Sequence, residues 1–270
     1  MSKSIEIQHL RVDYTERGRS FTALSDVSFT VNAGEFVSII GSSGCGKSTL
    51  LSILQGIQTP TSGQVLIDGQ PLRGTGTDRG VVFQHYSLFP WMTARKNVAF
   101  GVKQVKKNLS SAERLKIADE FLDRVGLAKF KNKYPSQLSG GMQQRVAIAR
   151  ALAMDTDILL MDEPFGAIDA KNRIILQGLL LKLWEGDGAQ KKTVVFVTHD
   201  IDEAIYLSDR IIMMASNPGR VHKELRVPFP RPRDREELLL HPEYGEFRNE
   251  LLALFYHDIN EDIEESEVAV

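Results

Sequence analysis

The chain has 270 residues, of which 42% are hydrophobic and 25% are charged, and its formal net charge is -2. This balance is typical of a globular protein with one large or two modest domains, and it does not favour nucleic acid as a partner, which usually requires a basic surface. The single cysteine, Cys45, excludes an internal disulfide framework. The chain lacks the apolar run of a signal peptide and any stretch of about 18 apolar residues that would span a membrane. We therefore expect a cytoplasmic protein that reaches a membrane only through a partner.

Alternation of apolar and polar residues predicts two antiparallel strands near the amino terminus, at 5–12 and 25–31. A polar loop around 16–19 is expected to join them. A third strand is predicted at 64–69, after a turn rich in Pro, Ser and Gly, and a further strand at 80–84. The first part of the chain is therefore expected to be rich in β structure.

Helical spacing is predicted from about 110 to 150, where Ser110 and Glu113 form a capping-box pattern ahead of a helix that ends near Gly126. The elements predicted after this block are strands at 158–161, 193–197 and 210–214 and a helix at 170–184. Continuous apolar runs of this kind are typical of parallel strands covered on both faces. The order predicts an α/β fold with a parallel-sheet core, an amino-terminal antiparallel β layer and an inserted α-helical subdomain at about 88–155.

A carboxy-terminal extension is expected over 229–270, after a main domain at 1–228. The extension opens with a Pro/Arg segment that disfavours a helix. Helical spacing follows at 236–255, interrupted near Pro242, so one or two helices are predicted. The acidic run at 261–267 is expected to be a solvated, frayed end.

The stretch Gly41–Thr49 has the pattern G-x-x-x-x-G-K-S between an apolar strand at 36–40 and an apolar helix start at 50–54. Its glycines let successive backbone N–H groups point inward at an anion. The helix start supplies further donors, Lys47 supplies a positive charge, and the Ser48 hydroxyl can ligate Mg²⁺. A turn that merely joins strand to helix is the alternative, but the spacing and both flanks favour a nucleoside triphosphate site.

Two adjacent carboxylates, Asp162 and Glu163, follow the apolar run at 158–161. They would lie at the carboxyl end of a parallel strand, where such sheets bind ligands. Asp162 is placed to hold Mg²⁺ together with Ser48, and Glu163 to polarise an attacking water near the γ-phosphate. An acidic pair that only caps the next helix is the alternative interpretation.

A second candidate phosphate site begins at Ser139, which is a favourable N-cap for a predicted helix. Gly140 and Gly141 follow and permit close approach of the backbone to an anion at the helix start. From the residues alone, a plain capped helix is about as good an interpretation as a phosphate site.

The combination resembles the nucleotide-binding subunit of an ABC transporter over essentially the whole chain. Gly41–Thr49 resembles the Walker A loop, and Asp162 and Glu163 resemble the Walker B aspartate and the catalytic glutamate. Ser139–Gly141 resembles the family signature, which in the family caps the γ-phosphate bound by the opposite subunit. The resemblance implies the fold of a P-loop NTPase with a RecA-like parallel-sheet core. It also implies a head-to-tail dimer with a second copy of the chain and two ATP molecules, with Mg²⁺, between the copies.

Smaller motifs extend the resemblance. Gln84 resembles the Q-loop glutamine that contacts Mg²⁺ and senses the membrane partner, and 167–169 resembles the D-loop. His199 resembles the switch histidine that contacts the γ-phosphate, and Tyr14 is the candidate adenine-stacking aromatic. Considered alone, these residues have simpler interpretations as a surface glutamine, a core histidine and an ordinary strand aromatic.

The predicted site has three overlapping sets of residues. The cofactor-binding set is Tyr14, Gly41, Ser42, Ser43, Gly44, Cys45, Gly46, Lys47, Ser48, Thr49, Ser139, Gly140 and Gly141. The predicted catalytic residues are Glu163, His199, Lys47 and Gln84, and the predicted metal ligands are Ser48, Gln84 and Asp162. The predicted cofactors are ATP and Mg²⁺.

Segments at 87–101, 165–167, 217–221 and 230–233 resemble the nitrate/sulfonate/taurine/bicarbonate importer subfamily. The resemblance implies that 87–101 receives the coupling helix of a transmembrane permease, at the cytoplasmic side of the cell membrane. It also implies an indirect partner, an extracytoplasmic solute-binding protein, which with the permease selects a small, anionic solute.

Other functions remain open at this point. Another class of ABC importer has the same nucleotide motifs. A DNA-repair ATPase would carry a long coiled coil between Lys47 and Ser139, and a translation ATPase would contain two cassettes, whereas the sequence shows neither. A non-catalytic nucleotide sensor would lack a residue like Glu163 or His199.

Overall fold

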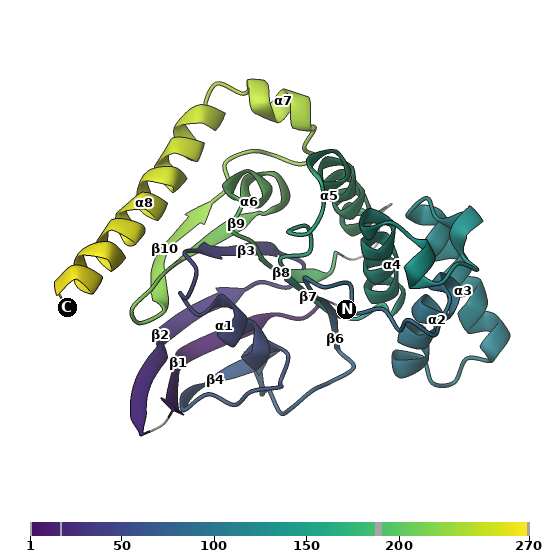
Figure 1. Cartoon of the computed structure of the whole chain (residues 1–270), viewed down its shortest axis with the longest axis horizontal. Coiled ribbons are helices and arrows are strands. Elements are labelled where there is room, and N and C mark those ends of the chain that lie inside the picture. The colour runs from purple at the N-terminus through teal and green to yellow at the C-terminus, as the bar shows by residue number, and fades with distance from the viewer. Residues whose placement is uncertain (1, 17, 187–190, 269–270) are drawn as a thin grey trace. The chain divides into compact units, whose positions relative to one another are not determined.

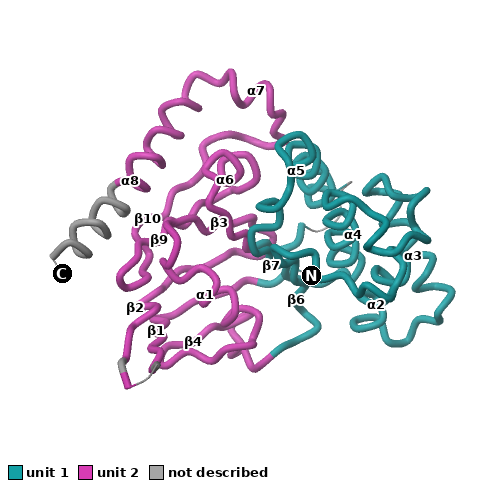
Figure 2. The backbone as a smooth tube through the Cα atoms, viewed as in Figure 1, with its two compact units in different colours: residues 1–3, 75–194 teal, residues 4–74, 195–270 magenta. Residues whose placement is uncertain are grey.

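The structure is a computed structural model that describes residues 2–16, 18–186 and 191–268 (Figure 1). The chain divides into two compact units, each built from separate stretches of sequence: unit 1 is 1–3 and 75–194, and unit 2 is 4–74 and 195–270 (Figure 2). Among the described residues, no helix combines the length and low polarity that crossing a membrane requires. The predicted boundary at residue 228 stays a prediction.

Unit 2 contains the antiparallel β layer predicted for the amino terminus. Its strands, in spatial order, are β2 (Arg19–Val31), β1 (Ile5–Glu16), β4 (Ser62–Ile67) and β5 (Gln70–Pro71). Alternate residues of β1, including Ile5 and Ile7, are buried, as its period-two pattern predicts. The loop expected at 16–19 is a tight connection, because Glu16 already pairs with Arg19; Arg17 lies outside the described residues.

A second group of strands in unit 2 leads to the phosphate-loop sequence. Strand β3 (Phe36–Gly41) is buried at all six residues and runs parallel to β9 (Arg210–Ala215), as predicted. Strand β10 (Arg220–Arg226), which the sequence did not predict, pairs antiparallel with β9. Its pattern escaped notice because Leu225 is its one fully buried residue. Helix α1 (Lys47–Leu54) follows the loop and buries its leucines and Ile53.

The carboxy-terminal helices of unit 2 are α6 (Ile201–Leu207), α7 (Arg235–Leu240) and α8 (Tyr244–Val268). The break between α7 and α8 contains Pro242, as expected from its missing N–H. The expectation of a frayed acidic end is wrong, since α8 continues through 261–267. Glutamate is a good helix former, and no glycine or proline follows Gly245 to end the helix.

Unit 1 alternates strands with helices. Its elements in chain order are β6 (Arg79–Val82), α2 (Ala94–Val105), α3 (Ser111–Arg124), short 3-10 turns at Ala128–Phe130 and Pro135–Gln137, α4 (Gly140–Ala153), β7 (Ile158–Asp162), α5 (Ala170–Glu185) and β8 (Thr193–Val197), which leads into unit 2. Strands β6 and β7 are parallel. The predicted capping box is confirmed: Ser110 accepts from the Glu113 N–H, and Glu113 accepts from the Ser110 N–H.

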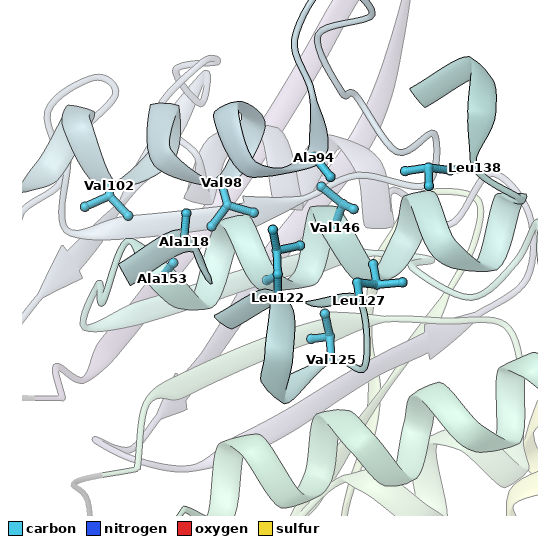
Figure 3. Packing of buried hydrophobic residues seen from close by; sticks show 11 residues of the cluster. Ala94, Val98, Val102, Ala118, Leu122, Val125, Leu127, Leu138, Val146 and Ala153 are labelled. Carbon is cyan, nitrogen blue, oxygen red and sulfur yellow. The ribbon is translucent and has the colours of Figure 1, made fainter. Parts of the chain in front are cut away.

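Helices α2, α3 and α4 pack around one apolar core (Figure 3). The buried residues of this helical core are Ala94, Val98, Val102, Ala118, Leu122, Val125, Leu127, Leu138, Val146, Ala149 and Ala153. Sequence patterns missed α2 because it contains Asn97 and Gly101, both poor helix formers. Both are required by packing: the buried Asn97 amide binds backbone groups of the preceding segment, and a Cβ on Gly101 would lie 2.8 Å from Arg150 Cγ in α4.

We predict that Leu122→Ala lowers the free energy of unfolding by about 2–5 kcal/mol, because it leaves a cavity in the helical core. Leu122 is fully buried there, at 0% exposure. Urea titrations followed by circular dichroism measure the effect. The control is Ile174→Ala on α5 of the same unit, where the side chain is 50% exposed and we expect a change within about 0.5 kcal/mol. Equal midpoints for the two variants would contradict the packing described here.

Candidate functional site

The residues Gly41–Thr49 connect β3 to α1, as the sequence predicted. Gly44 and Gly46 have φ angles of 91° and 90°, a region in which side chains other than glycine are strained. Gly46 occupies the N-cap position of α1 and supplies no side-chain cap. The first-turn N–H groups are therefore left for another acceptor, which is how helix starts bind phosphates.

The loop begins in a crowded place. A Cβ on Gly41 would lie 2.4 Å from the carbonyl oxygen of Met214 in β9 and 2.7 Å from Cys45 Sγ. The Ser42 hydroxyl is 2.6 Å from the Ser216 hydroxyl, just after β9. The loop is thus fixed to the end of β9 by a backbone contact that only glycine permits and by a side-chain hydrogen bond.

Lys47 connects the two ends of the loop. Its Nζ donates to the carbonyl oxygens of Gly41 and Ser42, both at 2.8 Å, and lies 3.4 Å from Cys45 Sγ. The lysine is 9% exposed, so these acceptors compensate part of the desolvation of its charge. The loop therefore holds a buried positive charge directly beside backbone groups that can face an anion.

Tyr14 is joined to the same part of unit 2. Its hydroxyl donates to Gln58 Oε1 at 2.9 Å and is 3.5 Å from Thr49 Oγ1. Its ring lies 5.3 Å from that of Phe21, which pairs with it across β1 and β2. Sequence reasoning named neither Gln58 nor Phe21, although the hairpin register would have placed Phe21 opposite Tyr14.

His199 is exposed, which excludes the alternative interpretation of it as a core histidine. Its neighbours in the chain are fixed by hydrogen bonds. Thr198 Oγ1 donates to Glu203 Oε2 at 2.6 Å, and Asp200 caps α6 by accepting from the Glu203 N–H at 3.1 Å. The residues on both sides of His199 are therefore held against the first turn of α6 by hydrogen bonds.

In unit 1, Asp162 ends β7 and Glu163 follows with a φ of 40°, an uncommon conformation for a residue with a side chain. Gln84 Nε2 donates to Glu163 Oε2 at 3.3 Å, so the structure brings these two predicted site residues together. The prediction that Gln84 ends a strand is wrong. Strand β6 stops at Val82, whose pairing with Met161 is the last of the ladder, and Gln84 lies on an exposed bend.

Ser139 caps α4 as predicted, because its hydroxyl accepts from the Met142 N–H at 3.3 Å. A Cβ on Gly141 would lie 3.4 Å from Asn172 Cγ. Asn172 binds Asp169, the cap of α5, through its N–H at 3.1 Å and its amide at 2.7 Å. These hydrogen bonds from Asn172 hold the pKa of the Asp169 carboxyl below its usual range. The start of α4 and the predicted D-loop therefore lie side by side within unit 1.

Two further contacts gather this part of unit 1, and sequence reasoning did not anticipate either. The buried Gln144 of α4 donates to the Pro164 carbonyl, directly after Glu163. A Cβ on Gly140 would lie 2.6 Å from Tyr86 Oη, two residues beyond Gln84. Unit 1 thus groups the glutamine, the carboxylates and the capped helix, while unit 2 carries the phosphate loop, the tyrosine and the histidine.

The family described as "ABC transporter" matches residues 24–166. The chain belongs to the ABC transporter family. The predicted family is therefore confirmed. The matched region includes the predicted Walker A, Q-loop, signature and Walker B residues, whereas Tyr14 and His199 lie outside it.

Close relatives of this ABC protein cover nearly its whole length. It is 48% identical over 249 residues to the nitrate import ATP-binding protein NrtD of Synechococcus elongatus, across 92% of this chain and 89% of the relative. It is 47% identical over 249 residues to the taurine import ATP-binding protein TauB of Roseobacter denitrificans, across 91% of both. It is also 46% identical over 259 residues to an uncharacterized ABC transporter ATP-binding protein of Methanocaldococcus jannaschii, across 96% and 94%.

Solved structures match the fold. A dimeric structure of the bacterial ABC transporter cassette MJ0796 is 40% identical and has a TM-score of 0.74, over 84% of this chain and all of that one. A dimeric post-hydrolysis state of MJ0796 bound to ADP and Pi is 39% identical, with a TM-score of 0.73. These matches confirm the predicted α/β P-loop NTPase fold.

We predict that Gly41→Ala lowers the melting temperature of the nucleotide-free protein more than Gly44→Ala does. A Cβ at Gly41 meets the Met214 carbonyl at 2.4 Å, whereas a Cβ at Gly44 has nothing within 4 Å and only its φ of 91° is unfavourable. The Gly44 variant should therefore lose about 1–2 kcal/mol from backbone strain alone. Scanning calorimetry compares the variants, and equal melting temperatures would show that the approach of Gly41 to β9 does not stabilise the loop.

Proposed function

We propose that this ABC ATPase energises the import of a small anion through a membrane permease. The observation that carries this proposal is the 47–48% identity to nitrate and taurine import ATP-binding proteins over about nine-tenths of the chain. A bicarbonate transport ATP-binding protein, CmpC of Synechococcus elongatus, is 45% identical over 254 residues, across 93% of this chain and 38% of that relative. The named solutes are small anions or zwitterions that carry an acidic group, which supports an oxyanion as the solute class.

The structure argues against the DNA-repair alternative. Such an ATPase would carry a long coiled coil between Lys47 and Ser139. All residues of that interval are described, and its longest helix, α3, has 14 residues and packs into the helical core. The interval therefore contains no long coiled coil of the kind expected of a DNA-repair ATPase.

The phosphates of ATP are proposed to bind in Gly41–Thr49. The uncapped start of α1 offers N–H donors, and Lys47 offers a charge that is already held at the loop by two carbonyl groups. Tyr14, fixed through its hydroxyl to Gln58, leaves a ring that is partly exposed. Stacking of adenine on this ring is part of the proposal.

The metal is proposed to be Mg²⁺, held by Ser48, Gln84 and Asp162. Their side chains offer hydroxyl, amide carbonyl and carboxylate oxygens, which is the hard oxygen set that Mg²⁺ prefers. The residues present therefore fit this ion. When bound, it would supply charge neutralisation at the phosphates.

Hydrolysis is proposed to depend on Glu163 as the group that accepts a proton from the attacking water. The Gln84 amide donates to this carboxylate and so restricts its orientation. His199, exposed beside the capped start of α6, is proposed to contact the γ-phosphate.

The partners follow from the same proposal. Two copies would form a head-to-tail dimer in which Ser139–Gly141 of one copy covers the γ-phosphate bound by the other, and the dimeric MJ0796 structures support a dimer. The pair would attach to permease subunits at the cytoplasmic face of the membrane. An extracytoplasmic solute-binding protein would deliver the anion to that permease.

We predict that Glu163→Gln binds ATP with unchanged affinity but hydrolyses it at least about 100-fold more slowly, because the carboxylate that accepts the proton is lost. The variant should accumulate as a dimer in MgATP, measured by light scattering after size exclusion. Glu120→Gln, at an exposed carboxylate on α3, is the matched control and should behave like the unaltered chain. Normal turnover by Glu163→Gln would reject the assignment.

We predict that the full transporter, reconstituted in liposomes with its permease and binding protein, hydrolyses ATP faster when the binding protein is loaded with nitrate, taurine or bicarbonate. Solute selection lies outside this chain, so its ATPase rate serves as the readout of the solute class. Maltose provides a neutral comparison. Stimulation by the neutral sugar and not by the acidic solutes would overturn the solute class while leaving the ATPase assignment intact.

A further inference from the structure

Helix α6 begins two residues after His199 and has only seven residues, Ile201–Leu207. A helix this short is marginal without tertiary support. Six of its seven residues are buried. Its position, and with it the chain direction at His199, therefore depends on what packs around it.

The carboxyl end of α6 is capped by arginines of the segment after β10. Arg233, which is 8% exposed, donates from Nη1 to the carbonyls of Ile205 at 2.9 Å, Tyr206 at 3.2 Å and Ser208 at 2.6 Å. Arg231 donates to the remaining carbonyl, that of Leu207, at 2.5 Å. Four consecutive carbonyls at the helix end are thus satisfied by two cations, which also suits the negative end of the helix dipole.

The first turn of α6 is held from α8. Asp202, three residues after His199, accepts from Tyr244 Oη at 2.7 Å and from Arg248 Nε at 2.7 Å and Nη2 at 3.2 Å. Burial alone would raise the pKa of Asp202, but the hydrogen bonds from Arg248 and Tyr244 hold that pKa below its usual range. The carboxylate is therefore charged at neutral pH and remains an acceptor for both partners.

Aromatic packing fixes the elements that carry these groups. The Phe229 ring lies 5.1 Å from His241, 6.0 Å from Tyr244 and 5.9 Å from Phe247. The Arg235 guanidinium lies 4.2 Å above the Tyr206 ring of α6. The segment 229–252 therefore contacts α6 at both of its ends and at the Tyr206 ring.

We propose that segment 229–252 is a brace that positions His199 for ATP hydrolysis, with Arg248 and Arg233 acting as positioning residues through α6. The proposal rests on the proposed function, in which His199 contacts the γ-phosphate. The link is short: Arg248 holds Asp202 in the first turn of α6, and the Thr198–Glu203–Asp200 hydrogen bonds tie that turn to the residues on either side of His199.

The test compares Arg248→Ala with Lys223→Ala in the full-length chain. Lys223 also ties α8 to the body of unit 2, through Glu250 at 3.2 Å, and this ion pair does not involve α6. We expect Arg248→Ala to lower kcat for ATP hydrolysis about 10-fold or more, with KM within about twofold, since small misplacements of a reacting geometry cost up to ~10²-fold. Lys223→Ala should leave both constants unchanged. The kcat of Arg248→Lys should lie between those of Arg248→Ala and the unaltered chain, because lysine keeps the positive charge but cannot make the bidentate hydrogen bond to Asp202.

A second measurement reports on His199 without relying on activity. The chain has six histidines, and the imidazole NMR signal of His199 is the one that disappears in His199→Ala. This signal should shift or broaden in Arg248→Ala and stay in place in Lys223→Ala. An unchanged His199 signal and kcat in Arg248→Ala, or equal losses in both alanine variants, would overturn the brace. If His199→Ala itself hydrolyses ATP normally, the proposed role of His199 fails as well; if only His199→Ala is impaired, the brace alone fails.

Discussion

Gly41 has no side chain, and this allows the end of β3 to lie against the Met214 carbonyl of β9, where a Cβ would be 2.4 Å from the oxygen. The rest of the phosphate loop depends on this approach. It brings the Gly41 and Ser42 carbonyls to the Lys47 ammonium, and it places the Ser42 hydroxyl against Ser216. The loop is thus shaped by contacts already present within unit 2, and a phosphate group would meet donors that need little rearrangement.

Hydrogen bonds and close backbone packing also shape the predicted site residues of unit 1. Ser139 caps the start of α4, Asp169 caps the start of α5, and Asp162 ends β7. The Gln144 contact to the Pro164 carbonyl and the Gln84 contact to Glu163 join these pieces. The helix start that we propose to cover a phosphate and the carboxylate that we propose to accept a proton therefore occur in the same unit, where a strand end and helix starts meet.

Short-range sequence patterns predicted several elements of the fold and the phosphate loop correctly. The Ser110 capping box and the buried run before Gly41 were predicted because their determinants lie within a few residues. Helix α2 was missed because Asn97 and Gly101 were selected by contacts with other segments and not by helix propensity. The contact between α6 and α8 could not be predicted from sequence either, because Asp202 and Arg248 are 46 residues apart and meet only in the folded chain. The reach of β6 was overestimated because apolar character continues past its last paired residue, Val82.

We propose that one copy supplies the phosphate loop and the partner supplies Ser139 to the same ATP. The direct measurement is crosslinking between chains that lack Cys45 and carry Glu163→Gln, one chain with Ser43→Cys and the other with Ser139→Cys; Ser43 and Ser139 are both exposed. We expect a covalent mixed dimer that forms with a short bifunctional reagent in MgATP and not without nucleotide. If the two chains associate in MgATP but no crosslink forms between the introduced cysteines, Ser139 does not reach the partner's phosphate loop and the proposal is wrong.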